Sequence, residues 1–368
     1  PTFTRALAEL ASALAFADFR GNQPESTQRA EQILEQLQRV APGSAEHLIG
    51  QAAYVYYTLR DFDRAHDILS QALQLSPSNV NALQMKSWIE RRQGDYDAYL
   101  MTRYETRRLD PRDPERTDHV LIALLVTHRY AEAWAESSSS GLKSFRIEHT
   151  RLLHRLSQDR DTKAFEAGVE QLCPRYRETD CGWSAYVANR NYSGALAVLG
   201  DPEDVDRQSP ISNHVRRWLY TAWLTDDDTS LEPYFSRWKA QLAADLETVE
   251  PYHRSPLYLG LALIAAVQGE EGTARQWLQR WERQNPVDRA ERMLRRHYAC
   301  RMYGIAADAA AAAQCIRVGL SEPSLVMPFM EPWLPFYDGV RDTPEFVGLL
   351  AELESSPGLR ALSASAGL

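Results

Sequence analysis

The side chains that most often do chemistry are present in the sequence, but their spacing matches no known kind of site. His149 and His154 are five residues apart, a poor fit to one helix face, so we interpret them as solvent-facing or helix-capping. The aspartates at 226–228 lack the alternating ligands and distal glutamate of a calcium loop, which favours a solvated turn. Glu270 and Glu271 fall where acidic residues stabilise a helix N-terminus.

Catalytic and nucleotide-binding motifs are missing from the chain. The sequence contains no HExxH pair, no nucleophile elbow, no phosphate-binding loop and no dinucleotide-binding glycine motif. We therefore predict no catalytic residue, no metal and no cofactor, and we expect the chain not to be an enzyme. A catalytic domain before Pro1 stays open, because the chain begins without methionine and we expect it to be a fragment of a longer protein.

The four cysteines are too few for a disulfide scaffold, and their spacing does not match a zinc site. Cys173 and Cys181 flank a loop-like stretch, so the sequence leaves open whether they form a disulfide. Cys300 and Cys315 are expected on two helices at unequal distances from their turn, where they should not reach each other.

Composition and charge exclude two classes of function. No apolar run approaches the roughly 18 residues that span a bilayer, and the first residues do not resemble a signal peptide. A net charge of −9 argues against binding to nucleic acid, which requires concentrated positive charge. We expect no direct membrane insertion, and we favour a cytoplasmic over a periplasmic location slightly, with the compartment left open.

The strongest pattern in the sequence is an internal repeat with a period of about 34 residues. The stretch RDFDRAHDILSQALQLSP begins at Arg60, and a related stretch, GDYDAYLMTRYETRRLDP, begins at Gly94. Phe62 matches Tyr96, and Pro77 matches Pro111, each one period later. Related segments end at Pro42 and Pro286, which indicates an array of similar units.

Residue types within the repeat predict a helix, a tight turn and a second helix. Ala65 and Ala72 lie on one helix face, where small side chains let paired helices approach, and Leu69 fills the seam between them. Asp61 and Asp95 are suited to capping helix N-termini. The prolines at the ends of the units stop one helix or begin the next.

This pattern resembles the tetratricopeptide repeat (TPR), most clearly over 46–111 and 255–286 and more weakly over 11–42, 114–136 and 180–200. One departure is Tyr99, which stands where a small residue is expected. The resemblance implies an all-α fold, a right-handed α-α superhelix with an irregular C-terminal cap. The tail, with MPFMEPWLPFYDGV, is similar to the ends of TPR regions in bacterial multidomain signalling proteins such as winged-helix regulators, class III cyclases and Ser/Thr kinases.

Breaks in the repeat predict three segments. Residues 1–136 form an N-terminal TPR-like block, 137–330 continue the solenoid with degenerate hairpins, and 331–368 cap the C-terminal end. The break SSSSG at 137–141 competes with helical hydrogen bonding. Whether the breaks are bends in one solenoid or a seam between two stays open, and we favour one continuous superhelix.

The resemblance also implies a binding groove, because repeat positions 2, 5, 9 and 12 face the concave wall of TPR proteins. In the 46–79 and 80–113 units these positions hold His47, Gly50, Tyr54, Tyr57, Asn81, Gln84, Trp88 and Arg91. We predict a partner-binding groove made by Tyr54, Tyr57, Gln84, Trp88 and Arg91. The 255 unit places apolar residues there, Pro256, Leu259, Leu263 and Ala266, which suggests self-packing or a protein partner.

Three functions follow from these observations. The favoured one is a non-catalytic scaffold that binds a protein or peptide in the groove, as the sensing or regulatory region of a larger bacterial signalling or transcription-regulatory protein. The alternative is a small-molecule-sensing module that relays ligand binding to an N-terminal effector domain. An autonomous enzyme is least favoured. A homo-oligomer stays open, as does the interpretation that the groove residues pack against neighbouring helices.

Overall fold

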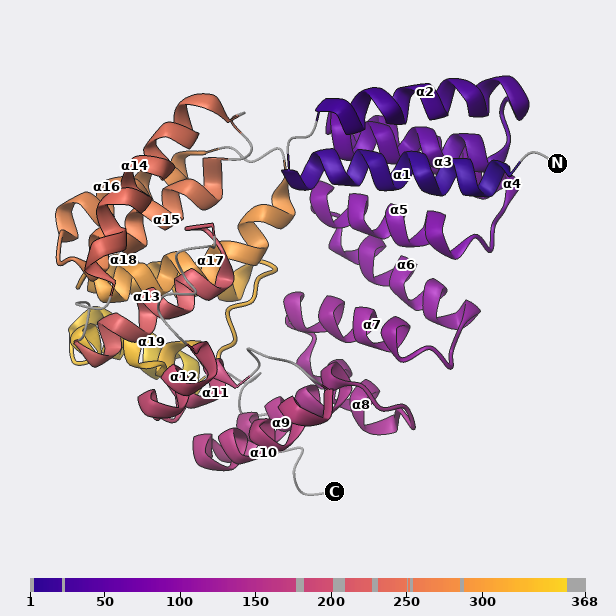
Figure 1. Ribbon diagram of the computed structural model, residues 1–368. Coiled ribbons are helices and arrows are strands. Elements are labelled where there is room, and N and C mark those ends of the chain that lie inside the picture. Colours follow the sequence, from indigo (N-terminus) through magenta and orange to yellow (C-terminus); the bar gives the residue numbers. More distant parts are fainter. Residues whose placement is uncertain are drawn as a thin grey trace. The chain divides into compact units, whose positions relative to one another are not determined.

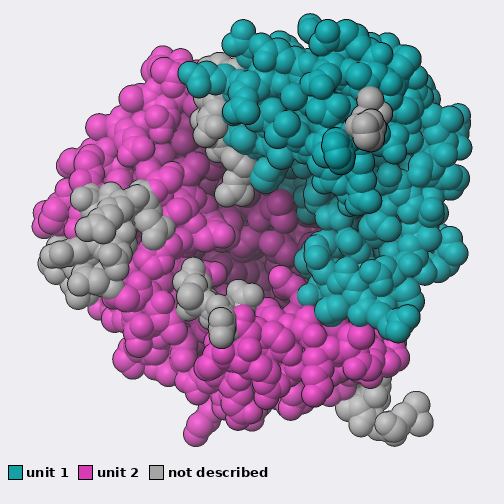
Figure 2. Space-filling model, turned by 45° about the vertical axis from the view of Figure 1, so that its right-hand side comes forward, with its two compact units in different colours: residues 1–123, 287–290 teal, residues 124–286, 291–368 magenta. Residues whose placement is uncertain are grey.

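The computed structural model describes residues 3–21, 24–176, 182–200, 209–226, 231–249, 251, 254–284 and 288–355. These residues form helices and connecting turns without any strand (Figure 1). The all-α solenoid class predicted from the sequence is confirmed. The chain divides into two compact units, residues 1–123 with 287–290 and residues 124–286 with 291–368, drawn in different colours in Figure 2.

Unit 1 contains a series of antiparallel helices that stack in sequence order (Figure 1). One turn of π-helix, η1, follows the third helix directly. The elements are α1 (Thr4–Gly21), α2 (Pro24–Val40), α3 (Ala45–Tyr54), η1 (Val55–Leu59), α4 (Phe62–Leu75), α5 (Val80–Gln93), α6 (Tyr96–Leu109) and α7 (Pro114–Val126), whose last turn extends into the second unit.

Unit 2 continues the helical hairpins and ends in a segment of 3-10 turns and a final helix. Its elements are α8 (Tyr130–Ser139), α9 (Phe145–Asp159), α10 (Thr162–Tyr176), α11 (Trp183–Ala188), α12 (Tyr192–Leu199), α13 (Asn213–Thr225), α14 (Glu232–Thr248), α15 (Arg254–Val267), α16 (Glu271–Arg283), α17 (Arg289–Ile305), α18 (Ala309–Ser321), η4 (Glu331–Trp333), η5 (Pro335–Val340) and α19 (Pro344–Ser355). Among the described residues, none of these helices or those of unit 1 has the length and apolar character needed to cross a bilayer.

The turns of the hairpins repeat with the sequence period. Arg60, Gly94 and His128 each adopt the left-handed conformation, at φ of 58°, 81° and 58°, so the turn residue recurs one period apart in three successive hairpins. Asp61 and Asp95 follow two of these turns and accept a hydrogen bond at 3.0 Å from the backbone N–H three residues later. The predicted N-caps are therefore confirmed.

The seam of the hairpins is built as the sequence predicts. Ala65, Leu69 and Ala72 of α4 are buried in the core of unit 1. Gly50 lets α3 approach its neighbours, because a Cβ atom at this position would lie 3.5 Å from the Cα atom of Ala8 and 3.2 Å from Leu34. Small residues therefore set how closely the helices of unit 1 pack.

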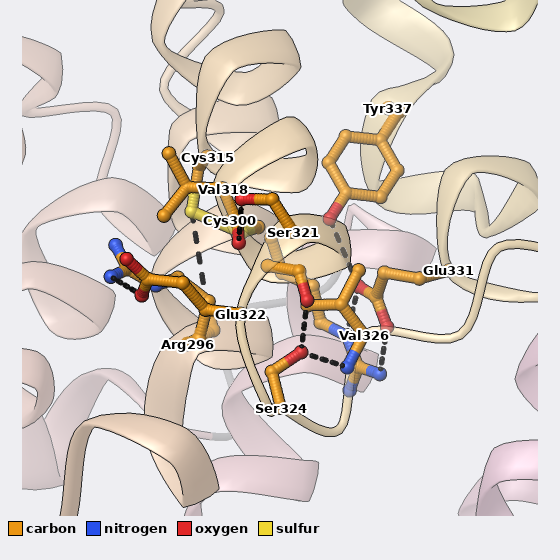
Figure 3. Close-up of a disulfide and its surroundings, with 12 residues drawn as sticks. Arg296, Cys300, Cys315, Val318, Ser321, Glu322, Ser324, Val326, Glu331 and Tyr337 are labelled. Atoms are coloured by element: carbon orange, nitrogen blue, oxygen red, sulfur yellow. Dashed lines mark hydrogen bonds and ion pairs between the residues drawn. A yellow bond between two sulfur atoms is a disulfide. The ribbon is translucent and has the colours of Figure 1, made fainter. Parts of the chain in front are cut away.

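A buried ion pair fixes the C-terminal segment of unit 2. The Arg301 side chain on α17 donates two hydrogen bonds, of 2.8 and 2.7 Å, to the carboxylate of Glu331 at the start of η4. The hydroxyl group of Tyr337 donates to the same carboxylate at 2.9 Å, and Figure 3 shows these two side chains pointing toward one another. Burial opposes the charge of Arg301, but Glu331 outweighs it and raises the pKa of the guanidinium group.

The sequence-based expectation for Cys300 and Cys315 is wrong. The structure joins them in a disulfide between α17 and α18, with Cα atoms 5.3 Å apart (Figure 3). Cys300 lies five residues before the end of α17 and Cys315 lies six residues after the start of α18, so both are almost equally far from the turn. The other pair includes Cys181, which lies outside the described residues.

We predict that replacing Glu331 by Ala lowers the free energy of unfolding by about 3–5 kcal/mol, because it leaves the buried charge of Arg301 without its partner. The matched control is Glu352→Ala, which breaks the similar two-bond pair of Glu352 with Arg317 on the surface. That change should cost at most about 1 kcal/mol. Urea unfolding followed by circular dichroism measures both, and equal losses would contradict the role of Glu331.

Candidate functional site

Unit 1 contains a cavity of about 830 Å³ between helices α1, α3 and α5. Aromatic, guanidinium and amide side chains share its wall with a few aliphatic ones. The lining residues are Arg5, Ala8, Glu9, Ser12, Ala13, Phe16, Phe19, Glu46, Ile49, Tyr56, Tyr57, Ser78, Asn79, Val80, Asn81, Gln84, Met85, Trp88, Arg91 and Arg92.

Helix α5 supplies the most regular part of this wall. The helix begins after Asn79, whose side chain accepts a hydrogen bond at 3.0 Å from the N–H of Ala82. Gln84, Trp88 and Arg91 then follow at helical spacing on the face that lines the cavity. These are three of the five residues predicted for the groove.

The two tyrosines predicted for the groove lie in different surroundings. Tyr57 lines the cavity. Tyr54 does not, because its hydroxyl group donates to Glu31 of α2 at 2.5 Å. The π-helical turn from Val55 to Leu59 begins directly after Tyr54, and it brings Tyr56 to the cavity wall beside Tyr57. A π-helical turn changes the angle between successive side chains, so Tyr57 no longer shares a face with the predicted positions before the turn, His47, Gly50 and Tyr54, none of which lines the cavity.

Aromatic rings surround the guanidinium group of Arg92 at one end of the cavity. Its Cζ atom lies 5.3 Å from the ring centroid of Tyr56 and 5.6 Å from that of Phe19. The side chain also donates to the hydroxyl group of Tyr56 and to the carboxylate of Asp288, which belongs to the same unit. Burial opposes the charge of Arg92, but Tyr56 and Asp288 outweigh it and raise the pKa. Arg92 is therefore a fixed positive charge within an aromatic setting.

The ring of Tyr57 stays neutral beside this charge. Burial, and then the neighbouring Tyr56, raise the pKa of Tyr57, and Arg92 opposes the shift only in part. Tyr57 contacts Phe16 edge to face, with ring centroids 5.2 Å apart. The cluster offers apolar area and a phenol donor to whatever enters the cavity.

Most charges of the cavity wall are already paired. Glu9 lies 3.6 Å from Arg5 and accepts a hydrogen bond at 3.0 Å from the side chain of Asn81. Arg92 has Asp288, as described above. Arg91 differs, because no carboxylate of the described residues lies within ion-pair distance of it and its Nε atom is buried without a hydrogen-bond partner. The wall therefore presents Arg91 as a positive charge without a paired carboxylate, and Glu46 of α3 lines the same cavity as a carboxylate in no ion pair of the described residues.

Sequence reasoning missed the contribution of α1. This helix lines the cavity with Arg5, Glu9, Ser12, Phe16 and Phe19. Their spacing of three or four residues is the signal that indicates one helix face. The helix carries no clean repeat signature, so the match to other units did not point to it.

The interpretation of the two histidines as solvent-facing or helix-capping is wrong for His149, whereas His154 is only half-buried. The ring of His149 packs against Phe145 and Phe165, at centroid distances of 5.3 and 5.8 Å, and burial and then Arg146 lower its pKa to about 3. His154 stacks on Trp134 at 5.1 Å. Aromatic residues one turn away and on neighbouring helices provide these contacts, which the spacing within one helix does not reveal.

The other described residues considered in the sequence as possible chemical groups lie at helix ends or in the core. Glu270 is the N-cap residue of α16, as expected. Asp226 ends α13 in the left-handed conformation, whereas Asp227 and Asp228 lie outside the described residues. Nowhere in the described part of the chain do three or more His, Cys, Asp or Glu side chains gather as a metal site would require. The apolar positions of the 255 unit, Leu259, Leu263 and Ala266, are buried in the core of unit 2.

A second cavity, of about 430 Å³, lies within unit 2. Its wall is mainly apolar, and the guanidinium group of Arg160 lies 5.2 Å from the ring of Trp333. The indole nitrogen of Trp333 is buried without a hydrogen-bond partner. The lining residues are Leu156, Arg160, Thr162, Ala188, Phe329, Met330, Trp333, Leu334 and Glu354.

Comparison with known proteins adds little to this picture. No protein-family model matches the chain, and no curated protein matches it. Among solved structures, one described as Naa15/Naa10 bound to HypK-THB is similar, with 13% sequence identity and a TM-score of 0.29. The match covers 96% of this chain and 58% of that chain, so this chain spans little more than half of its length. A likeness at this level carries no functional argument.

We predict that Tyr56→Phe lowers the free energy of unfolding by about 1–3 kcal/mol, because Arg92 then loses the phenol that accepts its buried hydrogen bond. Tyr54→Phe is the matched control, since its hydroxyl group bonds to exposed Glu31, and its cost should stay below about 1 kcal/mol. Thermal and urea unfolding of the two variants provide the comparison. If Tyr54→Phe lowered the free energy of unfolding as much as Tyr56→Phe, the buried hydrogen bond between Arg92 and Tyr56 would not account for the loss.

Proposed function

We propose that this chain is a non-catalytic scaffold whose unit 1 cavity binds a peptide segment with an aromatic or large apolar side chain and an acidic group. The observation that carries the proposal is the wall itself, where Trp88 and two tyrosines lie beside the uncompensated charge of Arg91. Trp, Tyr and Arg are the residue types that contribute most to binding free energy at protein interfaces.

The size and shape of the cavity support a peptide occupant. A volume of about 830 Å³ accommodates several side chains, and it is formed mainly by helices. Rigid aromatic side chains offer contact area at a small cost in conformational entropy. The wall therefore needs little rearrangement before a partner binds.

Charge complementarity supports an acidic group on the peptide. A carboxylate that contacts Arg91 would form the ion pair that the described residues do not supply. Arg5 and Arg92 already have Glu9 and Asp288, so they hold the wall in place rather than attract a partner. A basic group placed at Arg91 would instead meet a like charge.

The wider context of the proposal is a sensing or regulatory region of a larger bacterial signalling or transcription-regulatory protein. Its support is the resemblance of the repeats and of the Pro/Trp/Phe-rich tail to such proteins. The helical hairpin units provide the binding surface, and an effector domain elsewhere in the protein would use the information that a partner is bound. A second copy of the chain remains a further candidate partner.

A second candidate function rests on the cavity of unit 2. Its volume of about 430 Å³ lies in the range of small-molecule pockets, and the buried indole N–H of Trp333 offers a donor to a ligand. A small apolar molecule with an acceptor group would suit this wall. Thermal-shift screening of the full chain against metabolites tests this alternative, which requires a ligand whose stabilising effect disappears in Trp333→Phe.

The peptide proposal is tested by selecting binders from a displayed random peptide library on the full chain. We expect peptides that carry an aromatic and an acidic residue, and we expect Trp88→Ala and Arg91→Ala each to weaken their binding at least tenfold. Met101→Ala is the control, because Met101 is 67% exposed on α6 and does not line the cavity. Peptides that bind both cavity variants as tightly as the unchanged chain would refute the proposed site.

A further inference from the structure

Helix α6 breaks the seam pattern that holds the other hairpin together. Tyr99, Arg103 and Thr106 stand one repeat after Ala65, Leu69 and Ala72, the small and aliphatic seam residues of α4. A buried leucine position is thus occupied by arginine, which is 2% exposed. Packing alone does not explain this residue, because a buried charge is costly unless it is paired.

Two neighbouring helices, α5 and α7, bring further nitrogen-bearing side chains to Arg103. Arg91 of α5 and Arg103 of α6 both lie against the ring of Tyr99, with Cζ atoms 5.9 and 5.4 Å from its centroid. Arg116 and His119 come from α7. Besides burial, the charge of Arg116 lowers the pKa of Arg103, and the charge of Arg103 lowers the pKa of His119. The group of three arginines and one histidine is hereafter the arginine cluster.

Several polar atoms of the arginine cluster are buried without a hydrogen-bond partner among the described residues. These atoms are Nε and Nη1 of Arg103, Nε of Arg91, Nε of Arg116 and Nδ1 of His119. A buried polar group that makes no hydrogen bond destabilises the folded chain, and more so where the group is charged. Several such atoms close together can bind a ligand that accepts hydrogen bonds.

Carboxylates near the cluster lie against its α7 residues but leave Arg91 and Arg103 unpaired among the described residues. Glu115 Oε1 lies 3.8 Å from Nε2 of His119. Asp113 lies 3.2 Å from Nε of Arg116, and it also accepts a hydrogen bond from the N–H of Glu115. Glu90 is held by Lys86 through one oxygen, while its other oxygen has no partner and is therefore not bonded to Arg103. Arg91 and Arg103 consequently have no counter-ion among the described residues.

The charge state of the cluster follows from its surroundings. Burial, and then Arg103 and Arg116, lower the pKa of His119 to about 4, so the imidazole is neutral at neutral pH. Burial first, and then Arg91 and Arg116, lower the pKa of Arg103 against the opposing effect of Tyr99, yet guanidinium groups remain protonated in proteins. Three positive charges and one neutral ring therefore surround the site.

We propose that the arginine cluster is an oxyanion-binding site for a carboxylate or phosphate group carried by the peptide in the unit 1 cavity. The cluster joins that cavity through two residues, since Arg91 lines it and Gln84, which also lines it, accepts a hydrogen bond at 2.8 Å from Nη1 of Arg116. Guanidinium groups present paired N–H donors that match the oxygens of both anions. This inference rests on the proposed function and specifies the acidic group of its partner.

The first test uses inorganic phosphate as the probe, with chloride at equal ionic strength as the reference. Phosphate should raise the melting temperature of the full chain by several degrees, Arg103→Met should lose this shift, and Arg108→Met should keep it. Arg108 lies exposed on the same helix, so both changes remove one positive charge. Without phosphate, Arg103→Met should melt no lower than the unchanged chain, because it removes a buried unpaired charge. Persistence of the phosphate shift in Arg103→Met, or its absence from the unchanged chain, overturns the site.

The second test separates the source of the anion with a peptide selected on the full chain. Three versions of the peptide are compared: one keeps the acidic residue, one has phosphoserine in its place and one has Ala. Whichever of the first two peptides binds more tightly identifies the anion. Arg103→Met should weaken the anionic peptides at least tenfold and leave the Ala peptide unchanged, whereas Trp88→Ala should weaken all three. Weakening by Trp88→Ala alone overturns the anion site but not the groove. If phosphate raises the melting temperature and Arg103→Met abolishes this rise, but no peptide binds the chain, then the anion site stands. The link to the groove and the proposed function are overturned.

Discussion

The structure depends on one constraint, that a single helical hairpin cannot bury its own apolar face. Each hairpin must therefore stack on the next, and the closeness of the stack is set by small residues in the seam, such as Gly50, Ala65 and Ala72. Left-handed turn residues recur with the period of the sequence because each hairpin reverses at the same point. Where the stack ends, the buried pair of Arg301 and Glu331 attaches the irregular C-terminal segment to a helix of unit 2.

Departures from this seam show where the chain does more than pack. Tyr99 and Arg103 replace an alanine and a leucine, and the result is a cluster of guanidinium groups with unused donors beside the cavity. On the other wall, Tyr56 and Tyr57 of the π-helical turn both line the cavity, and Tyr56 accepts a hydrogen bond from Arg92. Both features go against what stacking alone favours, as functional sites often do.

The sequence predicts the repeat well because its signals are local. The caps at Asp61 and Asp95 and the helix face of Gln84, Trp88 and Arg91 depend only on spacing within one unit. The sequence did not predict the features that depend on tertiary contacts. The π-helical turn changes the faces after Tyr54, the α1 wall lies in a unit without a clean signature, and the disulfide of Cys300 depends on where the turn falls.

The central claim is that a peptide binds in the unit 1 cavity, with its acidic group beside Arg91. Hydrogen–deuterium exchange of the full chain, with and without an acidic peptide selected on it, tests this most directly. The account predicts slower exchange in α1, in η1 and along α5, the elements whose side chains line the cavity, with little change in unit 2. Protection confined to unit 2, or none in α1 and α5 at saturating peptide, would contradict it.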